Sequence, residues 1–148
     1  MIQVRNVTLN DAQALVDIYS YYVLNTTITF EYDTPSINEF TQRIQKITQK
    51  YPYLVATLND EIVGYAYATS YKERAAYDWS VEITVYVKND KHGLGVGKQL
   101  YTHLEQALKE KSIDFHTKFG FEKVGYFPKV GYKFNEWRDI VWMQKVIK

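Results

Sequence analysis

The segment YVKNDKHGLGVGKQLY, residues 86–101, contains three closely spaced glycines, Gly93, Gly95 and Gly97, with Lys91 before them and Lys98 directly after them. Glycines let backbone N–H groups approach a ligand closely. The segment joins a strand-like run to a helix-like run, and the start of a helix carries the positive end of its dipole. The pattern therefore predicts a phosphate-binding loop, although a tight strand-to-helix turn without a ligand is the alternative.

Two nucleotide-binding motifs do not match this loop. A P-loop requires a glycine where His92 stands and a hydroxyl side chain where Gln99 stands. A dinucleotide fingerprint requires its third glycine where Lys98 stands. The phosphate is therefore expected to belong to another kind of ligand.

A carboxylate precedes the loop in the strand-like run 81–87, which reads VEITVYV. Glu82 shares one strand face with Thr84 and Tyr86, and aliphatic residues take the other face. A carboxylate in an apolar strand is costly unless it is paired or used. Glu82 is therefore a candidate general base, and an ion pair with Arg74 or Arg138 is the alternative.

Length and composition predict one globular domain over residues 1–148. The chain has no cysteine, which excludes disulfides and thiolate chemistry, and no metal is expected. A net charge of +1 gives no reason to expect nucleic acid or membrane as partner. No leader-like or membrane-length apolar run is present, so a cytoplasmic location is expected.

Periodicity predicts a mixed α/β fold with the order βααβββα, followed by a short helix and two strands. Thr8–Asp11 and Ser36–Glu39 are capping boxes that begin the first two helices, and Asn59-Asp60 is a hairpin turn. The expected strands are 2–7, 54–58, 61–70, 79–87, 123–127 and 138–146, the last two joined by the loop 128–137. The first helix should end near residue 25, and the third should run from 95 to about 111.

The stretch His92–Gly97 resembles the acetyl-CoA-binding motif of the GNAT superfamily of N-acetyltransferases, Gln/Arg-x-x-Gly-x-Gly/Ala, with His92 in the Gln/Arg position. The resemblance implies the acyl-CoA N-acyltransferase fold, a mostly antiparallel sheet with a central parallel pair, and acetyl-CoA as cosubstrate. The cofactor-binding residues that it implies are Val85, Tyr86, Val87, Lys91, His92, Gly93, Leu94, Gly95, Val96, Gly97 and Lys98.

Several stretches are similar to the phosphinothricin N-acetyltransferase branch: residues 27–31, 64–68, 76–79, 81–87, 130–134 and 137–145, together with Lys72 and Arg74. Its members acetylate the α-amino group of small amino-acid-like substrates, including phosphinothricin, methionine sulfoximine and methionine sulfone. The resemblance implies direct transfer with Glu82 as base, and His116 could protonate the leaving thiolate. The substrate-binding residues expected are Phe30, Glu31, Lys72, Arg74, Tyr77 and Tyr132, with Arg74 as the first candidate for the substrate carboxylate.

Relatives often pair as dimers, and the helix with Tyr19, Tyr21 and Tyr22 has more aromatic surface than one face can bury, so a homodimer is expected. One expected element has no room in the sequence. Only residues 112–114 separate the helix ending near Lys111 from the helix expected to begin by Phe115 and to carry His116. The family places a parallel strand there, which with its loops takes about twenty residues.

Two explanations of this missing strand near 112–115 stay open. Either the protein carries about twenty further residues at this place, or the chain is truly shortened and its CoA site is open or inactive. The intact mass distinguishes these explanations. Two functional alternatives also stay open: a CoA-binding or interaction domain with weak catalysis, and an acetyltransferase for peptides or antibiotics.

Overall fold

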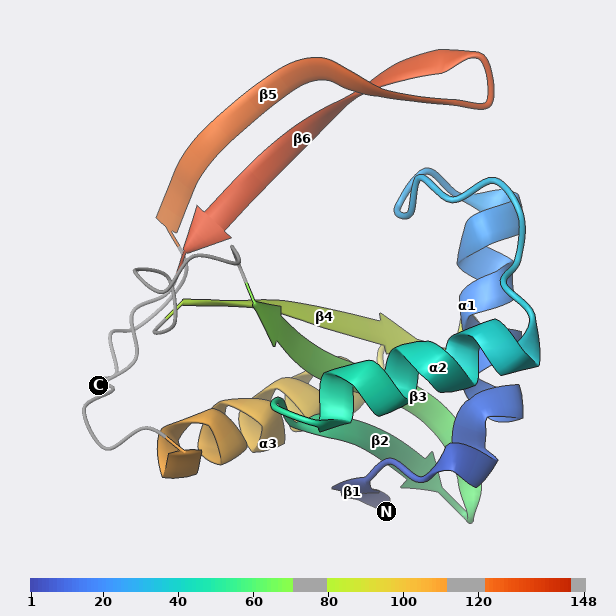
Figure 1. Ribbon diagram of the computed structural model, residues 1–148, viewed down its shortest axis with the longest axis vertical. Coiled ribbons are helices and arrows are strands. Elements are labelled where there is room, and N and C mark those ends of the chain that lie inside the picture. Colours follow the sequence, from blue (N-terminus) through green and yellow to red (C-terminus); the bar gives the residue numbers. More distant parts are fainter. Residues whose placement is uncertain (71–79, 112–121, 145–148) are drawn as a thin grey trace.

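The protein is described by a computed structural model covering residues 1–70, 80–111 and 122–144. Four strands form an antiparallel sheet in the order β1-β2-β3-β4 (Figure 1). They are β1 (Ile2–Asn6), β2 (Tyr53–Leu58), β3 (Glu61–Ser70) and β4 (Val81–Val87). The sequence predicts a strand at each of these four places, and the observed ends differ from the predicted ends by at most two residues.

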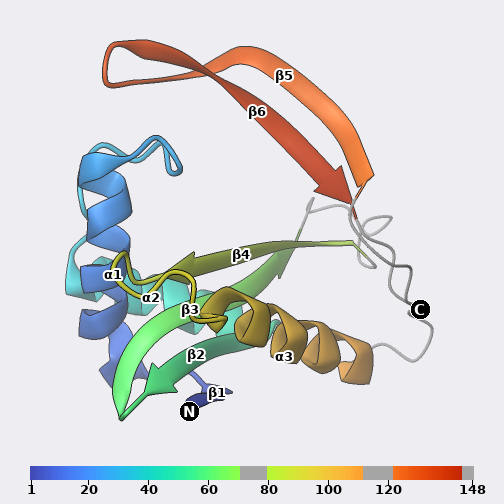
Figure 2. The ribbon, with the colours of Figure 1, turned by 180° about the vertical axis from the view of Figure 1, so that it is seen from behind.

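Helices cover both faces of this sheet. On one face lie α1 (Ala12–Asn25) and α2 (Ile37–Thr48), which pack through a core that includes Leu15, Phe40 and Ile44. On the other face lies α3 (Val96–Lys111), whose Leu100 and Leu104 are fully buried (Figure 2). These apolar helix faces agree with the predicted spacing.

The two predicted helix starts are confirmed. Thr8 and Asp11 form a capping box around the short 3₁₀ helix η1 (Leu9–Asp11), in which the Thr8 N–H donates to the Asp11 carboxylate at 2.7 Å. Asp11 also accepts two hydrogen bonds from the Arg5 guanidinium. At the start of α2, the Ser36 hydroxyl oxygen accepts from the Glu39 N–H at 3.0 Å.

The predicted turn between β2 and β3 is also confirmed. Asn59 and Asp60 both have positive φ, 52° and 67°, as a two-residue type I′ turn requires. The hairpin that they close aligns Tyr53 with Tyr67 and Val55 with Tyr65. These pairs place a row of large side chains on the sheet face that α1 and α2 cover.

The last two strands, β5 (Glu122–Lys133) and β6 (Glu136–Gln144), form a separate two-stranded antiparallel sheet. The prediction of a loop over 128–137 was wrong. β5 continues to Lys133, and the turn to β6 consists of Phe134 and Asn135, with φ of 54° and 60°. The reason is an irregularity between Phe127 and Gly131, which takes Pro128 out of the ladder. Because proline has no N–H to donate, a strand tolerates it at such a place.

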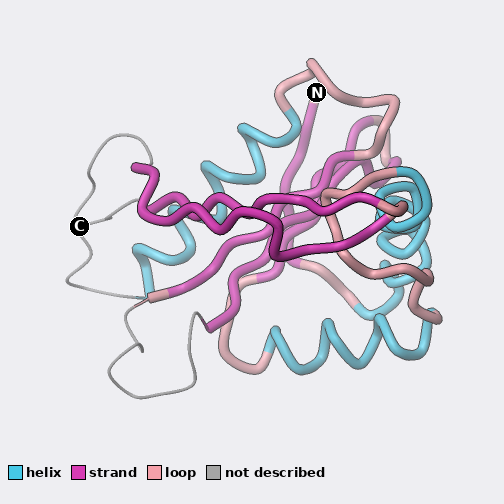
Figure 3. The backbone as a smooth tube through the Cα atoms, turned by 90° about the horizontal axis from the view of Figure 1, so that it is seen from above, coloured by secondary structure: helices cyan, strands magenta, loops and turns pink. Residues whose placement is uncertain are grey.

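The hairpin of β5 and β6 lies beyond β4, on the side of the sheet away from β1, and seen from above it passes over the helices and strands (Figures 1 and 3). Its turn reaches the segment after α1, where the buried Lys133 ammonium donates to the Thr29 carbonyl at 2.7 Å. Every strand pair in the described residues is antiparallel, and β4 pairs there with β3 alone. The parallel strand that the resemblance implies is not among them, and residues 112–121 lie outside them.

The reason given for a homodimer was wrong in part. Tyr19 and Tyr22 are buried, with exposed fractions of 6% and 5%, whereas Tyr21 is 39% exposed. The two buried rings pack on Tyr86 of β4, at centroid distances of 5.3 and 5.1 Å. Most of the aromatic surface of α1 is therefore core, and the dimer stays a prediction. Among the helices of the described residues, none has the length and apolarity needed to cross a membrane.

The close packing of α3 on β3 gives a test of the fold. A Cβ added at Gly64 would lie 2.9 Å from Val96 Cγ1 and 3.0 Å from the Tyr86 carbonyl oxygen. We expect Gly64→Ala to lower the free energy of unfolding by about 1–3 kcal/mol, because overpacking moves a buried helix. Urea unfolding measures this change.

The control for this test is Gly97→Ala, in the first turn of α3. Its Cβ would meet Val87 Cγ2 at an ordinary 3.6 Å. We expect no loss of stability, and a gain of up to ~1 kcal/mol because alanine favours helix. Equal stability for Gly64→Ala and the unchanged protein would contradict the packing described.

Candidate active site

A cleft of about 460 Å³ opens between the helices α1 and α2 and the exposed part of the sheet. Its walls come from α1, the segment after it, α2, β2, β3 and β4. The lining residues are Tyr19, Glu31, Phe40, Arg43, Lys46, Ile47, Tyr51, Tyr53, Tyr65, Tyr67, Thr69, Ser70, Glu82, Thr84 and Tyr86.

Glu82 lies in this cleft on β4, opposite Thr69 of β3, and its side chain is exposed. Thr84 and Tyr86 line the same cleft, whereas Ile83 and Val85 pack against the cluster under α3. The alternation predicted from the sequence is therefore confirmed. Of the two arginines considered as partners, Arg74 lies outside the described residues, and the side chain of Arg138 is not described.

The floor of the cleft is made of stacked tyrosines. Tyr53 and Tyr67 stack with centroids 4.8 Å apart, and Tyr65 contacts Tyr86 at 5.5 Å. Burial raises the pKa of Tyr86 to about 12 and raises the pKa of Tyr53 further. These phenols therefore stay neutral near pH 7 and do not compete with a carboxylate for the role of base.

A second carboxylate, Glu31, is held in the cleft wall by a charged partner. The Arg43 guanidinium donates to both Glu31 oxygens, at 2.7 and 3.1 Å, and the Tyr19 hydroxyl donates to Glu31 at 2.7 Å. The guanidinium hydrogen bond is the main reason why the pKa of Glu31 is lowered. Sequence reasoning selected Glu31 but missed Arg43, whose spacing from Glu39 indicates only an i,i+4 surface pair.

The other expected substrate residues are only partly described. The ring of Phe30 lies directly against Gly131 of the β5–β6 hairpin and is not in the cleft lining. Tyr132 is on β5, but its side chain is not described. Lys72, Arg74 and Tyr77, and His116 as the expected proton donor, lie outside the described residues.

The glycine loop lies between the end of β4 and the start of α3. Gly93 and Gly95 have φ of 82° and 83°, a conformation that glycine adopts most readily. A Cβ at either position would meet nothing within 4 Å, so there is open space beside the backbone. The N–H groups of the first three residues of α3, 96–98, have no acceptor within the helix, whereas the Gln99 N–H donates to the Gly95 carbonyl at 3.0 Å. Lys98 is exposed beside them. This space and these donors fit a phosphate group.

Hydrogen bonding decides which backbone groups of β4 point away from β3. The Lys88 N–H donates to the Val63 carbonyl at 2.8 Å, and the register pairs Val87 with Gly64. Because alternate residues of an antiparallel ladder bond the same neighbour, Tyr86 bonds β3 through its backbone. The N–H groups of Val85 and Val87 therefore point to the other edge, which has no strand partner among the described residues.

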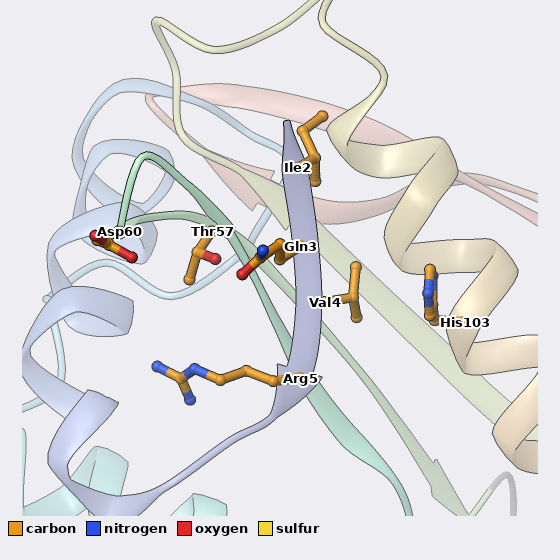
Figure 4. Close-up of a pocket in the computed structure, with 7 residues that line it drawn as sticks. All are labelled: Ile2, Gln3, Val4, Arg5, Thr57, Asp60 and His103. Carbon is orange, nitrogen blue, oxygen red and sulfur yellow. The ribbon is translucent and has the colours of Figure 1, made fainter.

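A second hollow, of about 530 Å³, lies along the edge strand β1 (Figure 4). It is lined by Ile2, Gln3, Val4, Arg5, Thr57, Asp60 and His103, none of which the sequence predicted as a site residue. Arg5 is already bonded to Asp11. No group of three or more potential metal ligands occurs in the part of the chain that the structure describes.

Comparison with known proteins identifies the family. Residues 4–114 match the acetyltransferase (GNAT) domain. A phosphinothricin N-acetyltransferase of Streptomyces viridochromogenes is 31% identical over 97% of this chain and 87% of its own. An L-methionine sulfoximine/L-methionine sulfone acetyltransferase of Pseudomonas aeruginosa is 31% identical over 95% of this chain and 92% of its own.

Solved structures agree with these sequences. A ribosomal-protein-alanine N-acetyltransferase of Brucella melitensis superposes with a TM-score of 0.91 at 27% identity, covering 98% of this chain and 99% of that one. A phosphinothricin acetyltransferase of Sinorhizobium meliloti, solved with acetyl-CoA, gives 0.87 at 27% identity, covering 99% and 89%. The chain belongs to the GNAT family and is an acetyl-CoA-dependent N-acetyltransferase.

The chain is shorter than its relatives inside the matched stretch. The alignment with the S. viridochromogenes enzyme spans 159 positions, but 97% of 148 residues is only about 144. About 15 positions of that relative therefore have no counterpart here. A difference of this size is close to the twenty residues expected between Lys111 and Phe115.

The ion pair in the cleft wall gives a prediction about pH. Glu31 has a lowered pKa, so its contribution to stability is present above the ordinary glutamate value near ~4.3 and is lost as the pH falls through the lower, folded value. We expect Arg43→Gln to raise the pKa of Glu31 towards the ordinary value and to weaken the acid dependence of stability below about pH 5. An NMR titration of the Glu31 carboxyl carbon measures the change.

Lys46→Gln is the matched control, since it removes a cation of the same helix and the same cleft. We expect it to change the pKa of Glu31 much less. Equal effects of the two substitutions would show that general charge, and not the bidentate contact, sets this pKa.

Proposed function

We propose that the protein moves the acetyl group of acetyl-CoA to the amino group of a small amino-acid-like substrate, with Glu82 as general base. The place of Glu82 carries this proposal. Its side chain lines the cleft, and along the far edge of its strand the N–H groups of Val85 and Val87 have no strand partner in the part of the chain that the structure describes. A substrate amine in the cleft and the thioester of acetyl-CoA along that edge would both lie beside β4.

The proton transfer asks little of the protein. A free α-amino group has a pKa near ~8, so a carboxylate can remove its proton at neutral pH, directly or through one water. Glu82 is exposed to the cleft, and burial keeps the neighbouring Tyr86 protonated. The Glu82 carboxylate is therefore the better candidate for the base.

Acetyl-CoA supplies a thioester carbon that the amine attacks: a C–N bond forms, the C–S bond breaks and the thiolate leaves with a proton. The carbonyl oxygen gains charge in this step and needs an N–H donor. We assign that donor to Val85 or Val87, because the Tyr86 N–H is used by β3. His116 remains our candidate for the proton that the thiolate takes up.

The loop 91–98 is proposed to hold the pyrophosphate of the same molecule. The open space beside Gly93 and Gly95, the first turn of α3 and the two lysines support this role. Leu94 and Val96 differ in place: Leu94 is 53% exposed, whereas Val96 is buried against Gly64 and anchors the helix start.

The names of the relatives and the charges of the cleft support an amino-acid-like acceptor. The relatives described above act on phosphinothricin and on methionine sulfoximine and sulfone. The cleft combines the Glu31–Arg43 pair with a further cation, Lys46, around a tyrosine floor. We propose that Arg74 and Lys72 bind the substrate carboxylate and that Glu31, Tyr77 and Tyr132 form the walls; Phe30, which packs on Gly131 outside the cleft lining, is no longer included.

Replacing the proposed base tests this function. We expect Glu82→Gln to lower kcat with acetyl-CoA and methionine sulfone by roughly 10²–10⁴-fold, because the amide cannot accept the amine proton. Release of free CoA, measured between pH 6 and 9, follows the reaction.

The control is Glu61→Gln at the exposed start of β3. Glu61 pairs with Lys88 and does not line the cleft, so we expect unchanged turnover. Full turnover by Glu82→Gln across this pH range would exclude Glu82 as the general base. If the unchanged protein binds CoA but acetylates no amino acid or oxidised analogue, the alternative of a CoA-binding domain with weak catalysis is favoured.

A further inference from the structure

Tyr22 connects α1 to both the end of β4 and the glycine loop. Its ring is buried, and its hydroxyl donates to the Val87 carbonyl. The same hydroxyl oxygen lies 2.9 Å from Nε2 of His92. These contacts join residues 65 and 70 positions apart in the sequence.

The proton count of the hydroxyl assigns the direction of both hydrogen bonds. A tyrosine hydroxyl has one hydrogen, and a carbonyl oxygen can only accept. Tyr22 therefore gives its hydrogen to Val87 and accepts from His92, so Nε2 of His92 carries a proton. The second ring nitrogen, Nδ1, is left for another partner, and it donates only when the ring is also charged.

The place of His92 suggests what that partner is. It directly precedes Gly93 and the open space at Gly93 and Gly95, and its side chain is exposed. Lys91 precedes it, and Lys98 is in the first turn of α3. An anion bound at this loop would lie next to the imidazole of His92. The hydrogen bond to Tyr22 would fix the orientation of that ring.

We propose that Tyr22 is a positioning residue that holds His92 as the side-chain ligand for the pyrophosphate of CoA, with the imidazole taking up a second proton on binding so that Nδ1 donates to the anion. This inference rests on the proposed role of the loop, but not on catalysis. His92 stands where the motif has glutamine or arginine, and its side chain is shorter than either. We infer that a fixed orientation of the ring compensates for the shorter side chain. The alternative is that Tyr22 only ties α1 to β4 through Val87.

A double-mutant cycle for CoA binding separates these two roles. Calorimetry is carried out on the unchanged protein, Tyr22→Phe, His92→Ala and the double variant. We expect each single substitution to weaken CoA binding roughly five- to tenfold, and the double variant to bind no more weakly than His92→Ala, because Tyr22 acts through His92. Tyr21→Phe, which removes the neighbouring exposed hydroxyl, should bind CoA normally.

Nitrogen NMR of His92 gives a second readout that needs no ligand. In the unchanged protein at neutral pH, Nε2 should carry the proton almost exclusively, and Tyr22→Phe should raise the share of the Nδ1–H tautomer. Additive losses in the double variant, or unchanged CoA affinity in Tyr22→Phe, would overturn the inference. CoA binding that follows this cycle without acetyl transfer would overturn only the proposed catalysis.

Discussion

The strand β4 is hydrogen-bonded to a described neighbour along one edge only, and the arrangement of the site depends on this. Its alternation puts Glu82, Thr84 and Tyr86 in the cleft and Ile83 and Val85 under α3. Its ladder with β3 uses the backbone of Tyr86 and turns the N–H groups of Val85 and Val87 outwards. One seven-residue strand thus carries the proposed base, part of the surface on which α3 packs, and two N–H groups that no described strand pairs with.

The helix α1 connects this strand to the rest of the site. Tyr19 reaches Glu31 in the cleft wall and Tyr22 reaches Val87 and the glycine loop, while both rings pack on Tyr86. The amine side and the phosphate side of the proposed site are therefore held by neighbouring turns of one helix. Tyrosine suits these two positions because its ring fills the core while its hydroxyl bonds a polar group.

Many elements of the fold and of the proposed site could be predicted from the sequence, because interactions between neighbouring residues determine them. The Thr8–Asp11 box, the Asn59-Asp60 turn and the two faces of β4 follow from capping, turn chemistry and alternation. Arg43, Tyr22 and the course of β5 could not be predicted in this way. Arg43 contacts Glu31 across a segment without regular structure, Tyr22 contacts a loop 70 residues away, and the irregularity at Pro128 depends on pairing with β6.

Amide hydrogen exchange at single residues is the sharpest test of the proposal that acetyl-CoA lies along the outer edge of β4. In the free protein, the amides of Val85 and Val87 should exchange much faster than those of Thr84 and Tyr86, which bond β3. Saturating acetyl-CoA should slow Val85 and Val87 and leave the other two unchanged. Exchange at Val85 and Val87 that is the same with and without acetyl-CoA would show that the cofactor does not bind along this edge.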